Sequence, residues 1–231
     1  AGHSWKCGRH FGSRIVFDKA GFLYFSNGGK GNIPMNAQNL NNAHGKIHRI
    51  KDDGGIPADN PFKDSLGNTS SIWTYGNRNP QGLFYDKETD RIWEVEHGPM
   101  GGDELNLIEK GKNYGWPVIT YGINYDGTPI TDIQEKEGME QPKHYWVPSI
   151  ATCGVAVVTS DKYPAWKGNI LVAALAKQHI ARVEMNGTAY VKEEKLLQDI
   201  GRVRQVAQSP DGYIYAITEA TGLLVKLLPI R

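Results

Sequence analysis

Three arginines stand where a loop meets the first strand of a sequence repeat: Arg78, Arg202 and Arg204. Arg202 and Arg204 are two residues apart, so on a β-strand their side chains project from the same face. Arg78 lies in YGNRNPQGL, where Asn79 precedes a proline and is therefore held in extended geometry. Because a guanidinium can bind a carboxylate through two hydrogen bonds, arginines that converge from separate repeats suit a ligand with several carboxylates. The alternative is solvated surface charge.

A second segment has the composition of a cation site. EHGPMGGDELN, residues 96–106, joins a tight loop rich in glycine to two carboxylates, Asp103 and Glu104. The loop residues whose carbonyls can turn inward are Gly98, Pro99, Gly101 and Gly102. Hard oxygen ligands of this kind suit calcium, although the spacing is not that of an EF-hand. The alternative is an acidic turn without a metal.

His10, in GRHFGSRIVF, is a candidate general base. An imidazole at the mouth of a channel can take up a proton near neutral pH. Because the chain has 7 histidines in all and a lone histidine is more often structural than catalytic, position alone does not select His10.

A repeated unit positions these candidates. Four segments share an apolar run, a turn of Asp, Gly, Lys or Pro, and a second run of aromatic and β-branched residues, which is typical of β-hairpins. They are residues 14–26, 82–96, 154–175 and 203–219. The strand-like pieces GKIHRI, IARVEM and LLVKLLPI follow three of them.

A unit of several strands that recurs every roughly 50–70 residues predicts a β-propeller, with one antiparallel sheet per blade. A β-sandwich, in which strands are spaced more evenly, is the alternative. We see no interdomain linker, so residues 1–231 are predicted to form a single domain. The long polar connections at residues 28–42 and 112–148 are where function is expected.

Composition narrows the classes of function. Lysine and arginine number 26 against 25 acids, so no net field attracts nucleic acid or anionic lipid. No apolar stretch approaches the roughly 20 residues of a membrane span. The first residues, AGHSWKCGRH, lack the apolar core of a signal peptide. Cys7 and Cys153 match no zinc or redox spacing, and their redox state stays open.

Five segments, in this order, resemble the soluble aldose sugar dehydrogenases, relatives of soluble quinoprotein glucose dehydrogenase. They are HFGSRIVFDKAGFLYFS, NAQNLNNAHGKIHRI, YGNRNPQGL, EHGPMGGDELNLIEKGKNYGWP and GRVRQVAQSPDGYIYAITE. The resemblance implies an all-β, six-bladed propeller and the tricarboxylic cofactor pyrroloquinoline quinone (PQQ) at the top of its channel. It also implies a calcium ion (Ca²⁺) at the cofactor and a periplasmic or extracellular location.

The same resemblance assigns roles residue by residue. His10 matches the family's general base, which takes the proton from the anomeric hydroxyl of the sugar. The cofactor residues are Arg78 and Asn79 on the quinone, Arg202 and Arg204 on its carboxylates, and Tyr125 in a loop that approaches it. The calcium residues are Gly98 and Pro99, through carbonyls at the cofactor, and Glu104 and Tyr114 at a second, structural ion.

Two positions depart from the family pattern. The family usually has a carboxylate at Gly29, where it would orient the catalytic histidine and raise its basicity. The family's cofactor-binding lysine falls on Ala176, with Lys177 one residue later. Since neighbouring residues of a strand point to opposite faces, we expect Lys177 to replace it only if a bulge or loop shifts the register.

A third departure is that the family has about two further blades before the position of His10. One of those blades carries a glutamine-and-glycine motif at the cofactor. About four blades are expected here, and an open set would expose apolar blade faces. We therefore expect the chain to pair with a further segment, to self-associate through the open flank, or to close into a smaller ring.

Three functions follow. The first is oxidation of aldose sugars to lactones with PQQ and calcium, to an electron acceptor that the sequence does not specify. The second is a calcium-stabilised propeller that binds a sugar or protein partner without catalysis, which the departures favour. The third, calcium-dependent lactone hydrolysis, has no need of the three arginines.

Overall fold

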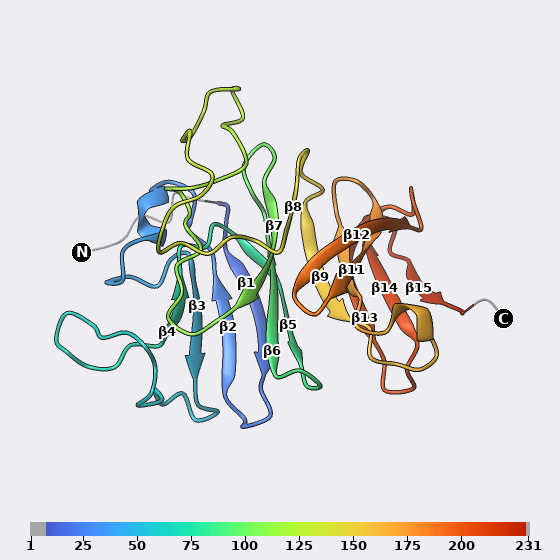
Figure 1. The fold of residues 1–231 in the computed structure, drawn as a ribbon, viewed down its shortest axis with the longest axis horizontal. Coiled ribbons are helices and arrows are strands. Elements are labelled where there is room, and N and C mark those ends of the chain that lie inside the picture. The colour runs from blue at the N-terminus through green and yellow to red at the C-terminus, as the bar shows by residue number, and fades with distance from the viewer. Residues whose placement is uncertain (1–7, 230–231) are drawn as a thin grey trace.

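Four antiparallel sheets follow one another along the chain in the computed structural model, which describes residues 8–229 (Figure 1). We number them blades 1 to 4. Blade 1 consists of β1 (Gly12–Phe17), β2 (Leu23–Asn27), β3 (Lys46–Ile50) and β4 (Ile72–Tyr75). Blade 2 consists of β5 (Pro80–Asp86), β6 (Arg91–Glu96), β7 (Asp103–Ile108) and β8 (His144–Trp146).

The remaining strands form blades 3 and 4. Blade 3 consists of β9 (Thr152–Val157), β10 (Ile170–Ala174), β11 (His179–Asn186) and β12 (Ala189–Leu196). Blade 4 has three strands, β13 (Arg202–Gln208), β14 (Ile214–Glu219) and β15 (Leu224–Leu227). Within residues 8–229 the helices are two short 3₁₀ turns, η1 (Pro34–Ala37) and η2 (Pro164–Trp166). The predicted all-β propeller with about four blades is confirmed.

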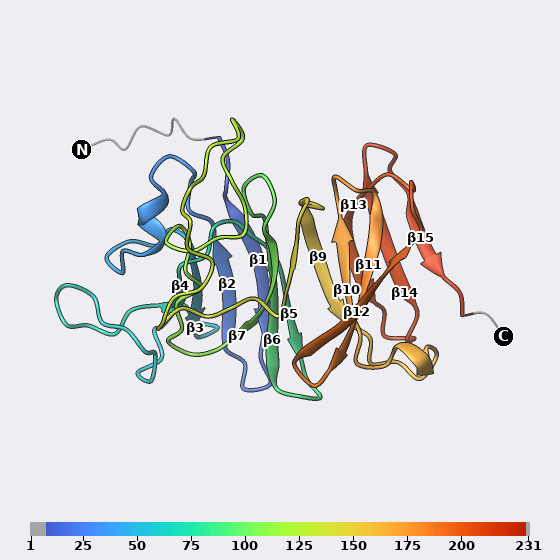
Figure 2. The same ribbon diagram turned by 45° about the horizontal axis from the view of Figure 1, so that its top comes forward.

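The first strand of each blade lies on the inside of the array. β1 contacts β5, β5 contacts β9, and β9 contacts β13. Figures 1 and 2 show the four sheets side by side in chain order, from blue at one side to red at the other. Loops that join or precede inner strands are therefore brought together, although they are far apart in the sequence.

Each predicted hairpin closes with the turn chemistry that its sequence indicates. In the turn Asp18–Gly21, the Asp18 carboxylate accepts hydrogen bonds from the amides of Ala20 and Phe22, each at 2.9 Å. Gly21 has φ +84°, a conformation that favours glycine. In the turn Ser209–Gly212, Gly212 also has φ +84°, and its amide donates to the Ser209 carbonyl at 2.8 Å, as the Gly21 amide does to the Asp18 carbonyl at 3.1 Å.

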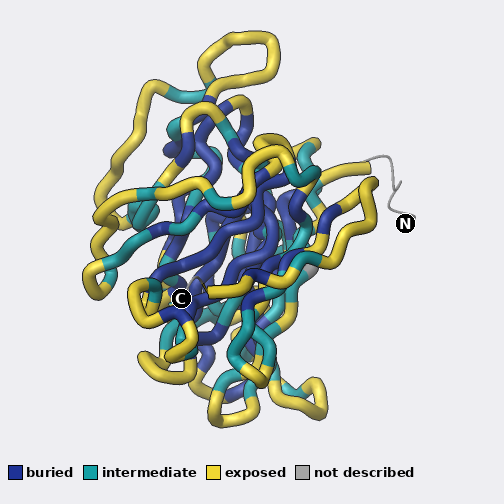
Figure 3. Tube along the Cα trace, turned by 90° about the vertical axis from the view of Figure 1, so that its right-hand side faces the viewer, coloured by how far each residue is buried: buried dark blue, intermediate teal, exposed yellow. Residues whose placement is uncertain are grey.

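Apolar side chains fill the spaces between successive blades. In β9, Val155 and Val157 pack toward Trp93 and Val95 of blade 2, whereas Ala156 of the same strand packs toward blade 4. Both faces of blade 3 are thus covered, which explains its continuous apolar run ILVAA. Figure 3 shows these buried strands at the centre and the exposed segments at the rim.

The outer strands were not predicted. β4, β8 and β12 lie at the edges of blades 1 to 3, and β12 is mostly exposed. β7 begins at Asp103, so the two carboxylates expected in a cation-binding loop lie on a strand instead. Across residues 8–229, no helix has the length and apolar character needed to cross a bilayer.

Candidate active site

His10 immediately precedes β1 and lines a cavity of about 120 Å³, which we call the His10 cavity. Its backbone has φ +60°, and its carbonyl accepts a hydrogen bond from the Lys30 amide at 3.2 Å. Other residues that line the cavity include Gly29, Arg78, Pro99, Trp116 and Tyr125. The cavity therefore brings together four residues to which the sequence analysis assigned roles: His10 as the base, Arg78 and Tyr125 at the cofactor, and Pro99 at the calcium ion.

The electrostatics of the cavity keep His10 neutral. Burial lowers the pKa of His10 from its ordinary 6.5 to about 3, and the positive charges of Arg78 and Arg9 act in the same direction. A neutral imidazole has a nitrogen lone pair free to accept a proton. His10 is thus in the protonation state of a general base at pH 7.

Arg78 is buried at the floor of the cavity. Its Nη1 donates hydrogen bonds to the carbonyls of His97 at 2.9 Å and Gly98 at 2.5 Å. Its guanidinium carbon lies 5.1 Å from the centre of the Trp116 ring. Among the described residues no acceptor reaches its buried Nε, so one guanidinium donor is left without a partner in this structure.

A buried carboxylate holds the turn that carries Arg78 and Asn79. Glu96, the last residue of β6, accepts hydrogen bonds from the amides of Arg78 at 2.5 Å and Asn79 at 3.0 Å. Burial raises the pKa of Glu96 to about 7, and these two donors oppose the rise. Glu96 is a positioning residue that the sequence analysis did not single out, although it begins EHGPMGGDELN.

The side chain of Asn79 joins the inner strands of blades 1 and 2. Its Oδ1 accepts hydrogen bonds from the Gly12 amide at 3.3 Å and from Gln81 Nε2 at 3.0 Å. Asn79 is buried and does not line the His10 cavity. Its assignment to the cofactor therefore stays a prediction.

Arg202 and Arg204 share an acidic partner on blade 4. Arg202 Nε lies 3.8 Å from Glu219 Oε2, and Arg204 forms an ion pair with the same carboxylate. A β-bulge between Val203 and Gln205 accommodates Arg204. The two arginines face the same side of β13, as predicted, but they do not line the His10 cavity.

Arg14 connects all four inner strands, and the sequence analysis assigned it no role. From β1 its Nε donates to the Gln81 carbonyl of β5 at 2.6 Å. Its Nη2 donates to Cys153 Sγ of β9 at 3.5 Å and to the Arg204 carbonyl of β13 at 3.4 Å. The sequence feature that could have indicated this role is that Arg14 is a charged residue directly before the apolar residues of RIVF. Cys153 is a buried free thiol, and Cys7 lies outside the described residues.

The loop of residues 98–102 is tightly folded. A Cβ on Gly98 would stand 2.1 Å from the Gly102 carbonyl oxygen, so only glycine fits there. The Gly98 carbonyl accepts the Arg78 hydrogen bond, and the Pro99 carbonyl accepts one from Ser149 Oγ at 3.4 Å. Pro99 lines the His10 cavity. A cation at the cofactor would therefore have Pro99 as a neighbour, whereas the Gly98 oxygen is engaged by a guanidinium.

Three glutamates and one asparagine form an acidic cluster across β6 and β7: Glu94, Glu96 and Asn106 are buried, and Glu104 is partly exposed. Glu96 pairs with Glu104, and Glu94 pairs with Asn106, in the strand register. Asn106 Nδ2 donates to Glu94 and to Glu104, each at 3.1 Å. Burial and mutual repulsion raise the pKa values of Glu94 and Glu104 well above the ordinary range.

The acidic cluster fits the chemistry of a hard cation. Glu94 Oε1 and Asn106 Oδ1 are buried with no hydrogen-bond partner within residues 8–229. A hollow of about 10 Å³ beside Glu96 and Glu104 has room for one water-sized particle. In that part of the chain, however, no three His, Cys, Asp or Glu side chains form a metal-binding group. Further ligands would have to be amide or backbone oxygens.

Tyr114 offers only its backbone to such an ion. Its hydroxyl donates to the Leu107 carbonyl at 2.5 Å and accepts from the Glu109 amide at 3.0 Å. The ring is buried in the core between blades 1 and 2. The side chain is thus structural.

Comparison with known proteins decides the family. The family model described as Glucose / Sorbosone dehydrogenase matches residues 2–226. The chain belongs to this family. The aldose sugar dehydrogenase YliI of Escherichia coli strain K12 is 43% identical over 226 residues, which cover 96% of this chain and 61% of the relative.

Solved structures agree with membership in the glucose/sorbosone dehydrogenase family. The apo-form of the soluble aldose sugar dehydrogenase from Escherichia coli has a TM-score of 0.91 at 42% identity, covering 96% of this chain and 65% of that one. The PQQ-bound aldose sugar dehydrogenase from Streptomyces coelicolor has a TM-score of 0.74 at 30% identity, covering 92% and 57%. The chain spans about three-fifths of the length of the Escherichia coli relative.

The lysine position differs from what strand geometry led us to expect in a glucose/sorbosone dehydrogenase. β10 ends at Ala174, and Ala176 and Lys177 lie in an exposed turn before β11. The alternation of strand faces therefore does not apply, because the segment is not a strand. Lys177 does not line the His10 cavity, so its cofactor role stays a prediction.

Gly29 lines the His10 cavity, and it is the position at which the family resemblance led us to expect a carboxylate. A Cβ there would stand 3.3 Å from the Arg78 carbonyl, so a side chain needs only a small shift. We expect Gly29→Asp to raise the pKa of His10 and to increase turnover, because an adjacent carboxylate stabilises the imidazolium. NMR titration of His10 and steady-state kinetics measure this. Gly29→Asn is the matched uncharged control, and an unchanged His10 pKa in Gly29→Asp would contradict the expectation.

Arg14 is expected to stabilise the array of inner strands in this member of the family. We expect Arg14→Ala to lower stability by about 2 kcal/mol, because its partly buried charged hydrogen bonds are lost. At this chain length that corresponds to a melting temperature lower by about 4–8 °C. Arg91→Ala, at the start of β6, is the control for losing an arginine. Equal melting of Arg14→Ala and wild type would exclude the bridging role.

Proposed function

We propose that the protein oxidises aldose sugars to lactones with PQQ and calcium, with His10 as the general base. The observation that carries this proposal is that His10 and Arg78 share one cavity with Pro99 and Tyr125. Membership in the glucose/sorbosone dehydrogenase family supports it.

The chain's own groups perform the proton transfer. A Cβ on Gly31 would stand 3.1 Å from His10 Nδ1, so Nδ1 faces the loop and Nε2 is left to face a substrate. Nε2 of the neutral imidazole accepts the proton of the anomeric hydroxyl. When bound, PQQ supplies the quinone carbon that takes up the hydride.

The arginines fit a tricarboxylic ligand. Arg78 lines the cavity, and its buried Nε has no acceptor among the described residues; Arg202 and Arg204 would bind carboxylates in place of Glu219. A cavity of about 120 Å³ is smaller than the roughly 300–1,000 Å³ of sites that enclose their ligands. The cofactor would therefore lie across the cavity mouth, with Asn79, Tyr125 and Lys177 as further contacts to be tested.

Calcium would serve two places. Near the cofactor, Pro99 would contribute its carbonyl oxygen. Gly98 would contribute its own only if Arg78 gave up its hydrogen bond to that oxygen. In the acidic cluster, Glu104 and the Tyr114 backbone would hold a structural ion. We also propose a periplasmic or extracellular location, in keeping with the family resemblance.

A non-catalytic propeller is the alternative, and two observations favour it. Gly29 gives His10 no carboxylate partner, and Lys177 lies in an exposed turn outside the cavity. The discriminating experiment adds calcium and PQQ to the purified protein and records the cofactor's absorbance when glucose is added. Loss of the oxidised cofactor's absorbance supports oxidation. Unchanged absorbance, or absence of cofactor binding, contradicts oxidation and supports the alternative.

The outer faces of blades 1 and 4 predict self-association. Ile15 and Phe17 of β1 are 63% and 52% exposed, and the cross-strand pair Ile217 and Leu224 of blade 4 is 49% and 68% exposed. Apolar faces of this kind are normally covered in a propeller. We expect this chain alone to form dimers or larger species in size-exclusion chromatography with light scattering. A monodisperse monomer of 25.6 kDa would contradict this expectation.

A further inference from the structure

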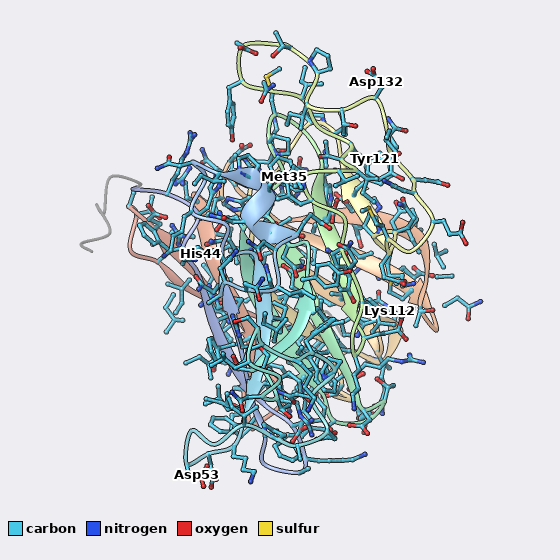
Figure 4. All side chains as sticks on the ribbon, turned by 90° about the vertical axis from the view of Figure 1, so that its left-hand side faces the viewer. Met35, His44, Asp53, Lys112, Tyr121 and Asp132 are labelled. Carbon is cyan, nitrogen blue, oxygen red and sulfur yellow. The ribbon has the colours of Figure 1, made fainter. Side chains whose placement is uncertain are left out.

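A groove of about 670 Å³ lies at the rim between blades 2 and 3, and we call it the tyrosine groove. Its main lining residues are Tyr121, Glu135, Gln141, Lys143, Tyr145 and Tyr190. It shares no lining residue with the His10 cavity. Figure 4 shows Tyr121 toward the same end of the molecule as Asp132, opposite Asp53. The volume is in the range of small-ligand sites.

Two parallel ring pairs dominate the tyrosine groove. Tyr121 and Tyr145 stack with centroids 3.8 Å apart at 8°, and His144 and Tyr190 stack at 4.2 Å and 4°. Each partner covers one face of the ring beside it. Tyr145 is 41% exposed and Tyr190 is 40% exposed, so each offers its other face and its edges to solvent.

Hydrogen bonds hold these rings in place before any ligand binds. Tyr121 donates to Gln141 Oε1 at 2.7 Å. Glu193 Oε2 accepts from Trp146 Nε1 at 2.6 Å and lies 3.3 Å from His144 Nε2, which fixes the imidazole beneath Tyr190. A ligand that binds the exposed ring faces therefore loses little conformational entropy in ordering these side chains.

The combination of flat rings and polar groups matches one ligand chemistry. A pyranose ring has a face of C–H groups, which the electron-rich face of an aromatic ring attracts, and an edge of hydroxyls. The groove supplies an acceptor and a donor for hydroxyls, the carboxylate of Glu135 and the ammonium of Lys143. The Gln141 amide already bonds Tyr121 and Gln134, and its second hydrogen and lone pair remain. We propose that the tyrosine groove binds sugar rings of an oligosaccharide.

Other occupants fit less well. A peptide strand added to the edge strand β8 would find only three strand residues there, between Pro142 and Pro148. Nucleic acid is disfavoured because Glu135 and Glu193 oppose the single Lys143. A purely apolar ligand would leave the polar groups at the groove without partners.

Two segments of the chain connect the tyrosine groove with the His10 cavity. Tyr121 begins the loop that continues to Tyr125, which lines the cavity. Val147 of the groove packs against Gly101, since a Cβ there would be 3.5 Å from it, and Gly101 belongs to the loop of Pro99. An oligosaccharide in the groove would thus be held close to the proposed site of oxidation, but its binding does not depend on that proposal.

Calorimetric titration of maltotriose into the calcium-loaded protein without quinone tests the inference. Wild type is expected to bind saturably, and Tyr145→Ala and Tyr190→Ala are each expected to weaken binding about tenfold through loss of a ring face. Tyr145→Phe, which keeps the ring, and Phe17→Ala, an exposed aromatic on β1, should leave the affinity nearly unchanged. Circular dichroism verifies that each variant is folded.

Several outcomes would overturn the inference. They are absence of saturable binding in wild type, wild-type affinity in both folded tyrosine-to-alanine variants, and loss of binding in His10→Ala alone, which would place the sugar in the His10 cavity. Equal weakening in Phe17→Ala would show nonspecific contact. Maltotriose binding without any glucose-dependent loss of quinone absorbance would retain this inference and remove the proposed function.

Discussion

His10→Ala is expected to lower turnover with glucose by roughly 10²–10⁴-fold while leaving quinone affinity close to that of wild type, because His10 acts in proton transfer. Arg78→Ala and Arg204→Ala are expected to weaken quinone binding instead, by about 10–100-fold, because each removes a charged hydrogen bond. Spectroscopic titration of the quinone and steady-state kinetics separate the two effects. His44→Ala, outside the His10 cavity, is the histidine control. Equal loss of quinone affinity in all three variants would make His10 a binding residue.

The pH dependence of the same step follows from the lowered pKa of His10. The imidazole stays neutral until the pH approaches about 3, rather than its ordinary 6.5. We therefore expect no protonation of the base, and no loss of kcat/KM from it, as the pH falls from 7 to about 5. Below pH 6.5 the unfolded chain binds a proton at His10 that the folded protein does not bind. His10 therefore lowers the stability of the folded protein as the pH falls from 6.5 toward 3. His10→Ala should reduce this loss of stability. A kcat/KM inflection near the ordinary value would contradict the burial of the base.

Chelation is expected to lower the melting temperature by about 5–10 °C, since a ligand at 100 times its Kd stabilises the native state by about 2.7 kcal/mol. The physical reason is the acidic cluster, where the buried Glu94 and Glu96 lie beside Glu104 and a cation would offset their repulsion. Calorimetry with calcium and with EDTA measures the effect. Glu104→Gln should remove the EDTA sensitivity, and Glu137→Gln, at an exposed loop position, should keep it.

The metal-free state gives a second readout of the same cluster. Because burial raises the pKa of Glu96 to about 7, the folded protein holds a proton that the unfolded chain releases near 4.5. In EDTA, the contribution of Glu96 to stability should therefore be fully present below that lower value and should be lost as the pH rises through about 7. Calcium should reduce this loss. Identical melting curves with calcium and EDTA across this range would show that protons, not a metal, neutralise the cluster.

Strand patterns predicted the inner hairpins well and the outer strands poorly. Residues 14–26 and 203–219 alternate apolar side chains around recognisable turns, which local chemistry alone produces. β12 is polar and exposed, and β8 has three residues. Such edge strands are stabilised by pairing with β11 and β7, a nonlocal interaction that leaves little periodicity in their own sequence.

Family motifs, rather than spacing, selected the site residues. His10, Arg78, Pro99 and Tyr125 were assigned by resemblance and line one cavity. Arg202 and Arg204 were correctly expected on one strand face, but the structure pairs them with Glu219 away from that cavity. Lys177 could not be placed from strand alternation, because the strand ends at Ala174.

The sequence by itself determined the all-β class, the number of repeats and which residue types we propose for carboxylate binding and proton acceptance, because hairpin periodicity and short motifs are local properties. Only the tertiary structure decided which side chains meet. Arg14 reaches three other blades because the inner strands lie side by side, and Glu104 faces Glu96 because β6 pairs with β7 in that register. The tyrosine groove likewise joins Tyr121, Tyr145 and Tyr190 from three separate segments. No local pattern encodes these contacts, since each depends on how strands distant in the chain pack and pair.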